Sequence, residues 1–191
     1  MNYLKKIKYN SPVILSFTFL SFFVLILGYL TTGISTGLLF CVYKSSPLDP
    51  LFYIRLFTHV LGHADWQHFL NNFMLILLVG PMLEEKYGSK KLLGMMVFTA
   101  FITGLINIVF FETALLGASG IAFMLILLSS FVNMKQGGIP LTFILVAAAY
   151  IGNEIINGVI GQDNISQLTH IIGGICGCSL GFILNKNKSK S

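Results

Sequence analysis

Apolar residues are concentrated in six long runs along this chain, and short polar or charged segments separate the runs. A helix needs about 20 largely apolar residues to cross a bilayer. The runs lie at roughly 12–36, 68–83, 91–111, 119–134, 139–159 and 168–185. The pattern predicts an all-α membrane protein, with a compact bundle of six transmembrane helices over 12–185 and short basic tails at 1–11 and 186–191.

The composition supports this prediction and adds an orientation. Of the 191 residues, 55% are hydrophobic and only 10% are charged, which is more apolar surface than a soluble core of this size can bury. Lysines gather in both tails and in alternate connections, whereas the opposite connections carry only Lys44 and Arg55. The positive-inside rule then places both termini in the cytoplasm. Because this topology explains the net charge of +5, we expect no nucleic-acid partner.

The connection between the first and second runs, residues 41–67, is too apolar and aromatic for a solvated loop. We expect it to fold back against the outer leaflet. Arg55 has two interpretations there: it either ties backbone carbonyls of the connection together or extends its charge to lipid head groups. After the second run, Glu84 is expected to hydrogen-bond the ends of neighbouring helices, which is a structural role.

His59 and His63 stand four residues apart, a spacing that suggests a metal site on a helix. However, no HExxH glutamate follows them, and Asp65 is the only nearby carboxylate. The three cysteines lie within or beside apolar runs, at spacings that fit neither a metal site nor a disulfide framework. We therefore expect no metal and no cofactor.

The fourth run opens with Gly117-Ala118-Ser119-Gly120, which places a hydroxyl between glycines where an extended segment becomes a helix. The backbone N–H groups of Ser119 and Gly120 lack intrahelical acceptors there and can face a developing oxyanion. Gly117 and Gly120 have no Cβ, so a substrate backbone can approach the hydroxyl closely. Small residues also serve plain helix packing, and this motif alone does not separate the two interpretations.

Two other runs carry polar side chains that fit a reaction at this serine. His68 and Asn72 are one helical turn apart on one face, and such donors in a membrane serve either chemistry or helix packing. His170 opens the sixth run, where Gly173 and Gly177 follow as a smooth stripe. If the stripe packs on the fourth run, the imidazole and the hydroxyl come within hydrogen-bond reach; otherwise His170 is an interfacial residue.

In this combination, the chain resembles the rhomboid family of intramembrane serine proteases in its basic six-span bacterial form. The matching residues are Gly117-Ala-Ser119-Gly120 for the GxSG motif, His170-x-x-Gly173-x-x-x-Gly177 for the histidine helix and His68-x-x-x-Asn72 for the HxxxN motif. The three motifs fall on the fourth, sixth and second runs, in the family's order. The resemblance covers roughly residues 50–182.

The resemblance implies a Ser–His dyad without an acidic third member, in which Ser119 is the nucleophile and His170 the general base. It also implies an oxyanion hole formed by His68, Asn72 and the Ser119 backbone N–H, with Phe123 stacked under His170. The implied substrates are transmembrane proteins that are cut near the outer end of a span. The implied location is a bacterial plasma membrane, and the oligomeric state stays open.

The resemblance further gives His63 a structural role in organising the outer connection. Two positions depart from the family pattern. Ile54 precedes Arg55 where the family commonly has tryptophan, and Thr169 precedes the histidine in place of the usual alanine. Neither change removes a catalytic group.

Two other functions fit parts of the sequence. A non-enzymatic rhomboid-like protein that binds membrane clients would share the fold, but the intact Ser119 and His170 argue against it. A small transporter or channel would show an inverted repeat or a pair of interrupted helices, and the sequence has neither.

Overall fold

The computed structural model describes residues 8–130, 141, 144–145, 148–149 and 164–188. In these parts the regular elements are helices: α1 (Pro12–Leu30), α2 (Ile34–Leu39), α3 (Pro50–Thr58), the 3-10 helix η2 (His59–Leu61), α4 (Trp66–Tyr87), α5 (Ser89–Phe110), α6 (Ser119–Ser129) and α8 (Asn164–Lys188). The only β pairing within the same ranges is an isolated antiparallel bridge between Val42 and Leu115. The prediction of an all-α protein is confirmed.

Two of the described helices, α1 and α5, are each long and apolar enough to cross a membrane. Most of the predicted fifth span, 139–159, lies outside the described residues, and α6 is described over only 11 residues. The count of six spans therefore stays a prediction.

The first apolar run is not one helix through residue 36. α1 ends at Leu30, and the chain turns through Thr31, Thr32 and Gly33, of which the last two have positive φ (50° and 87°). The Thr31 hydroxyl donates to the Leu27 carbonyl (2.8 Å), and glycine readily adopts the left-handed conformation that follows a helix end. Apolar residues continue after the turn, so hydropathy alone gave no sign of this break.

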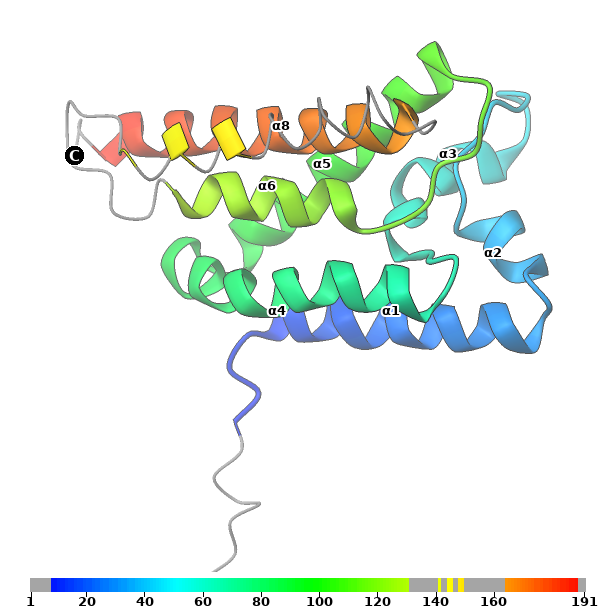
Figure 1. Cartoon of the computed structure of the whole chain (residues 1–191), viewed down its shortest axis with the longest axis horizontal. Coiled ribbons are helices and arrows are strands. Elements are labelled where there is room, and N and C mark those ends of the chain that lie inside the picture. Colours follow the sequence, from blue (N-terminus) through cyan, green and yellow to red (C-terminus); the bar gives the residue numbers. More distant parts are fainter. Residues whose placement is uncertain (1–7, 131–140, 142–143, 146–147, 150–163, 189–191) are drawn as a thin grey trace, which may run out of the picture.

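α6 lies at the centre of the fold. It packs between α4 and α8, while α1 covers the other side of α4 (Figure 1). Apolar side chains of α6, including Ile121, Met124, Leu125 and Leu128, are fully buried. A helix that is hydrophobic all round is expected in such a central position. The N-terminus of α6 at Ser119 consequently lies beside α4 and α8, the two elements that carry the other candidate residues.

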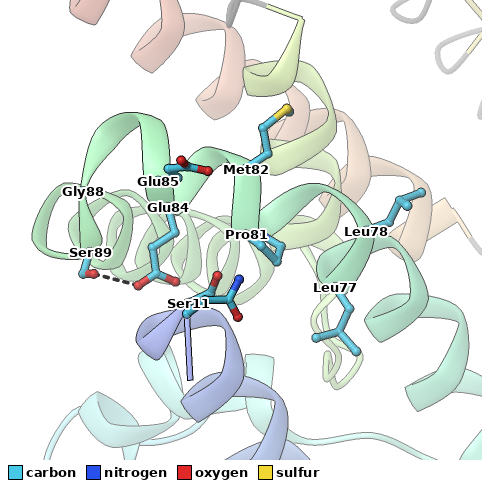
Figure 2. A pocket seen from close by; sticks show the side chains of 10 residues that line it. Ser11, Leu77, Leu78, Pro81, Met82, Glu84, Glu85, Gly88 and Ser89 are labelled. Carbon is cyan, nitrogen blue, oxygen red and sulfur yellow. Dashed lines mark hydrogen bonds between the residues drawn. The ribbon is translucent and has the colours of Figure 1, made fainter. Parts of the chain in front are cut away.

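A buried carboxylate joins three helix ends on the opposite side of the bundle. Glu84, in the last turn of α4, is 4% exposed and accepts hydrogen bonds from the Val13 and Ile14 N–H groups (2.9 and 3.0 Å) in the first turn of α1. It also accepts from the Ser89 hydroxyl (2.7 Å) at the start of α5, the bond drawn in Figure 2. These N–H groups have no intrahelical acceptors, and helix N-termini favour a negative charge. Glu84 also lines an open groove of about 760 Å³ at this end of the bundle.

The connection between α1 and α4 is held together by Arg55. This side chain is 3% exposed; its Nε donates to the Leu38 carbonyl (2.8 Å) and its Nη1 to the Asp49 carboxylate (3.2 Å). The guanidinium also lies over the Tyr43 ring, 4.5 Å from the ring centre. Of the two interpretations of Arg55, the structure therefore supports the internal tie. The placement of this connection at the outer leaflet stays a prediction.

Candidate active site

The segment that leads into Ser119 is fixed by hydrogen bonds to the segment before α4. Gly117 has a φ of +122°, which disfavours any residue with a side chain, and its N–H donates to the His59 carbonyl (3.0 Å). The N–H of Ala118 donates to Nε2 of His63 (3.4 Å). α6 begins at Ser119, so the Ser119 N–H also has no acceptor within the helix. The Ser119 side chain is half-buried, and the two residues before it are held by these hydrogen bonds.

His68 and Asn72 of α4 face the backbone of Gly117. A Cβ built on Gly117 would lie 2.6 Å from Nε2 of His68 and 3.8 Å from Nδ2 of Asn72, so a side chain at this position would displace the His68 ring. Asn72 is 6% exposed, and among the described residues its Nδ2 has no hydrogen-bond acceptor. A buried donor without an acceptor costs about 1–3 kcal/mol, which a bound acceptor would recover.

α6 and α8 touch backbone to backbone along the glycine stripe. A Cβ on Gly173 would come far closer than 3.0 Å to the carbonyl oxygen of Gly120, and one on Gly177 would do the same at Met124. Real Cβ atoms essentially never come within 3.0 Å of such an atom. The stripe therefore packs on the fourth run, which is the packing that the sequence left conditional.

The same contact sets His170 beside the start of α6. The ring of His170 lies against the ring of Phe123, with 4.4 Å between ring centres and an angle of 44° between planes. The Thr169 carbonyl oxygen is 3.6 Å from the Cβ position of Gly120. Ser119 lies directly before Gly120 and one helical turn before Phe123, so the structure brings the hydroxyl-bearing turn of α6 and the imidazole-bearing turn of α8 together.

The sequence profile of the Rhomboid domain matches residues 51–187, well over half of the chain. The chain belongs to the rhomboid family. Among curated relatives, it is similar to the protein named Rhomboid protease GlpG of Haemophilus influenzae, with 28% identity over 140 residues that cover 72% of each chain. It is also similar to proteins of that name from Salmonella paratyphi A and Salmonella newport, with 25% identity over 164 residues. This rhomboid spans 56% of the length of those Salmonella relatives.

In this rhomboid, His59 is part of the scaffold under the nucleophile segment. It is buried, its Nδ1 lies 3.1 Å from the Arg55 carbonyl oxygen, and its Nε2 lies 3.3 Å from the Thr103 hydroxyl. Burial lowers the pKa of His59 to about 4, so the ring is neutral at pH 7. Within the described residues, no group of three or more His, Cys, Asp or Glu side chains is placed to hold a metal ion.

His63 contacts both the nucleophile segment and His68. Because its Nε2 accepts the Ala118 N–H, its Nδ1 carries the proton and donates to the Leu61 carbonyl (3.2 Å). The ring also makes an edge-to-face contact with the ring of His68, with 5.0 Å between centres. Burial, with a smaller contribution from the neighbouring His68, lowers the pKa of His63 to about 4, so His63 also stays neutral at pH 7.

The two departures from the family pattern have different surroundings. Ile54 is exposed, and the buried Arg55 beside it holds the connection without a tryptophan neighbour. Thr169 is buried, and its methyl carbon lies 3.4 Å from the Cβ position of Gly120. The extra atoms of Thr169, compared with alanine, therefore add packing at the contact between α6 and α8.

Sequence reasoning missed the role of backbone groups around the site. It considered His59 only as a metal ligand, whereas its carbonyl holds the Gly117 N–H. It also gave no role to the bridge between Val42 and Leu115, which joins the outer connection to the segment before Ser119 (2.9 and 2.8 Å). No signal in the side chains could have revealed either contact, because both are made by main-chain atoms.

Proposed function

We propose that this rhomboid is an intramembrane serine endopeptidase, with Ser119 as nucleophile and His170 as general base. The observation that carries the proposal is the close contact between α6 and α8. Gly173 lies on the backbone of Gly120, and His170 lies on Phe123. Together these contacts put the two reactive groups at the same end of the paired helices, where both are half-buried.

In the proposed reaction, His170 removes the proton from the Ser119 hydroxyl as the oxygen attacks the scissile carbonyl carbon. The bond to nitrogen then breaks, and the imidazolium gives this proton to the leaving amine. Water, deprotonated by the same imidazole, next attacks the carbonyl carbon of the acyl-serine ester. The ester bond then breaks, the imidazolium returns the proton to the Ser119 oxygen, and the new C-terminal carboxylate is released. In this proposal the dyad needs no acidic third member, because the Phe123 ring packs against the imidazole and would orient it.

The oxyanion of each tetrahedral intermediate would be held by three donors: the Ser119 N–H, Nδ2 of Asn72 and Nε2 of His68. The unused Nδ2 of buried Asn72 supports this role, since it is a donor held ready for an acceptor. Removing one such donor in other hydrolases costs roughly 10²–10³ in kcat. Gly117 keeps the space beside these donors free of a side chain, which lets a substrate carbonyl enter.

The proposed substrates are transmembrane proteins. A helical span hides its carbonyls in hydrogen bonds four residues apart, so a substrate has to unwind locally before attack. Residues that weaken helices near the scissile bond would therefore favour cleavage. The names of the relatives, Rhomboid protease GlpG, support the reaction class. We place the protein in a bacterial plasma membrane, as a multi-pass protein with both termini in the cytoplasm.

The proposal is tested by replacing Ser119 with alanine in the reconstituted protein. Ser119→Ala should abolish cleavage of a single-span reporter and also labelling by a fluorophosphonate, which reacts with activated serines. Ser129→Ala is the matched control, because Ser129 is at the other end of α6 and, among the described residues, its hydroxyl bonds only the local Ile126 carbonyl. Equal turnover in wild type and Ser119→Ala would refute the mechanism. A wild-type protein that neither cleaves nor labels would instead favour a client-binding rhomboid without activity.

A further inference from the structure

A second cavity lies behind the nucleophile segment, on the side away from α8. It has a volume of about 480 Å³ and is bordered by the end of α1, by α2 and by the residues that join η2 to α4. Its walls come from Leu25, Gly28 and Tyr29 on one side and from Thr36, His63 and Ala64 on the others. Ligand pockets in proteins typically measure about 300–1,000 Å³, so this volume suits a small ligand or part of a larger one. The turn at the end of α1 creates the cavity, because it folds α2 back beside that end (Figure 1).

The walls suit an uncharged, apolar ligand. None of the residues that line the cavity carries a charge at neutral pH, since the pKa of His63 is lowered to about 4 by burial. The polar side chains at the walls are mainly threonine hydroxyls. The groove in Figure 2 differs in this respect, because the carboxylates of Glu84 and Glu85 line it.

The cavity opens beside exposed apolar side chains that form the expected lipid-facing surface of the protein. Tyr29 at the mouth is 49% exposed, and its neighbours Leu30 and Ile34 are 77% and 70% exposed. α1 is apolar enough to span a membrane, so we expect the exposed apolar side chains at its end to face lipid. Trp66 stacks on Tyr29, with 6.1 Å between ring centres and an angle of 20°. Aromatic residues of this kind gather where lipid chains meet the interface.

The inner wall of the cavity belongs to the active site. His63 lines the cavity and also accepts the Ala118 N–H, one residue before Ser119. A ligand that fills the space therefore presses on the ring that holds the nucleophile segment. The ring already packs on the rings of His68, Phe69 and Phe73, and a ligand in the cavity would add contacts on the remaining side.

We propose that this cavity binds one acyl chain of a bilayer phospholipid, which enters beside Tyr29 and ends against His63. The expected lipid-facing surface beside the opening identifies the source of the ligand, and the uncharged walls select its hydrocarbon part over its head group. Bound lipid then supports the nucleophile segment through His63. This last consequence rests on the proposed protease function, whereas the binding itself does not.

Trp66 provides a direct test, because it is the only tryptophan in the chain. The full-length protein is reconstituted into phosphatidylcholine vesicles that contain increasing mole fractions of a phosphatidylcholine with brominated acyl chains, and tryptophan fluorescence is measured. If an acyl chain is bound beside Trp66, part of the quenching should saturate at a low mole fraction of brominated lipid. This part adds to the gradual quenching that comes from random lipid contact. Random-contact quenching alone, as a water-filled cavity would give, overturns the proposal.

Variants separate the cavity from the general lipid surface. Thr36→Phe fills the cavity from α2 and should remove the saturable component. Ile34→Phe adds the same ring two residues earlier, at an exposed position outside the cavity, and should retain it. Ala64→Leu fills the cavity from the opposite wall and serves if Thr36→Phe does not fold. Equal saturable quenching in the filled variants and the control contradicts the assignment.

The same quenching is measured in Ser119→Ala, since lipid binding requires no hydrolysis. A protein that cleaves its reporter but shows no saturable component refutes the lipid site alone. A protein that shows this component in both forms but never cleaves refutes the protease alone.

Discussion

Replacing Gly173 with alanine tests the contact on which the proposed dyad depends. A Cβ at this position would fall well inside 3.0 Å of the Gly120 carbonyl oxygen, whereas ordinary van der Waals contact begins near 3.4 Å. The obstacle is backbone, so no side chain can rotate away. α8 and α6 therefore have to separate by about 1 Å, and a misplacement of that size can lower a rate about 100-fold.

The expected loss has two parts that can be measured separately. Overpacking a tight contact costs typically about 1–3 kcal/mol of stability, which should lower the melting temperature in detergent. The separation moves His170 away from Ser119, so kcat for a single-span reporter should fall about 100-fold, equivalent to about 2.7 kcal/mol in the activation barrier. Gly177→Ala acts one turn further along, at Met124, and should reduce kcat less than Gly173→Ala does.

The matched control is Gly94→Ala on α5, because a Cβ there has nothing within 4 Å. Alanine favours a helix over glycine by up to about 1 kcal/mol, so this variant should keep full activity and lose no stability. The three variants are compared by reporter cleavage, fluorophosphonate labelling and thermal unfolding. A Gly173→Ala protein that folds and cleaves like wild type would refute the argument that the glycine contact positions the dyad.

Three further predictions follow from individual contacts. Asn72→Ala should lower kcat roughly 10²–10³-fold. Asn71→Ala, at the exposed neighbouring position, should leave kcat nearly unchanged. Equal effects of the two variants in the reporter assay would exclude an oxyanion role for Asn72. Glu84→Gln should destabilise the protein by about 2–3 kcal/mol in thermal unfolding, because it weakens charge-assisted hydrogen bonds to three donors. Glu85→Gln, at the exposed neighbouring position, is the control and should change stability by less than about 0.5 kcal/mol. The buried side chains of His59 and His63 have pKa values of about 4 in the folded protein, below the ordinary histidine value of about 6.5. The unfolded chain therefore binds more protons between these two values, and stability falls as the pH drops through this window. Each of the two histidines should lower the free energy of unfolding by about 2 kcal/mol at pH 5 relative to pH 7.5. In melting experiments, His63→Gln should reduce the dependence of the melting temperature on pH. A melting temperature that does not change with pH would contradict the lowered pKa values.

The candidate site could be predicted from the sequence where short spacing decides the geometry. Residues four apart on a helix share a face, so the positions of His68 and Asn72 on one side of α4 followed from their numbers alone. A serine between glycines at the start of an apolar run likewise predicted a helix start at Ser119, where α6 begins. These features are local, and the periodicity of a helix encodes them directly.

Tertiary structure decided which elements meet and what the backbone does at each meeting. The sequence left open whether Arg55 hydrogen-bonds carbonyls of the outer connection or extends to lipid head groups. Its side chain is buried and donates to the Leu38 carbonyl, which supports the first interpretation. Hydropathy did not reveal the end of α1 at Leu30, where Gly33 was the local stop signal, and the use of the His59 carbonyl by Gly117 had no sequence signal. Main-chain groups are the same in every residue, so their partners depend on how distant segments pack, and only the folded chain determines that.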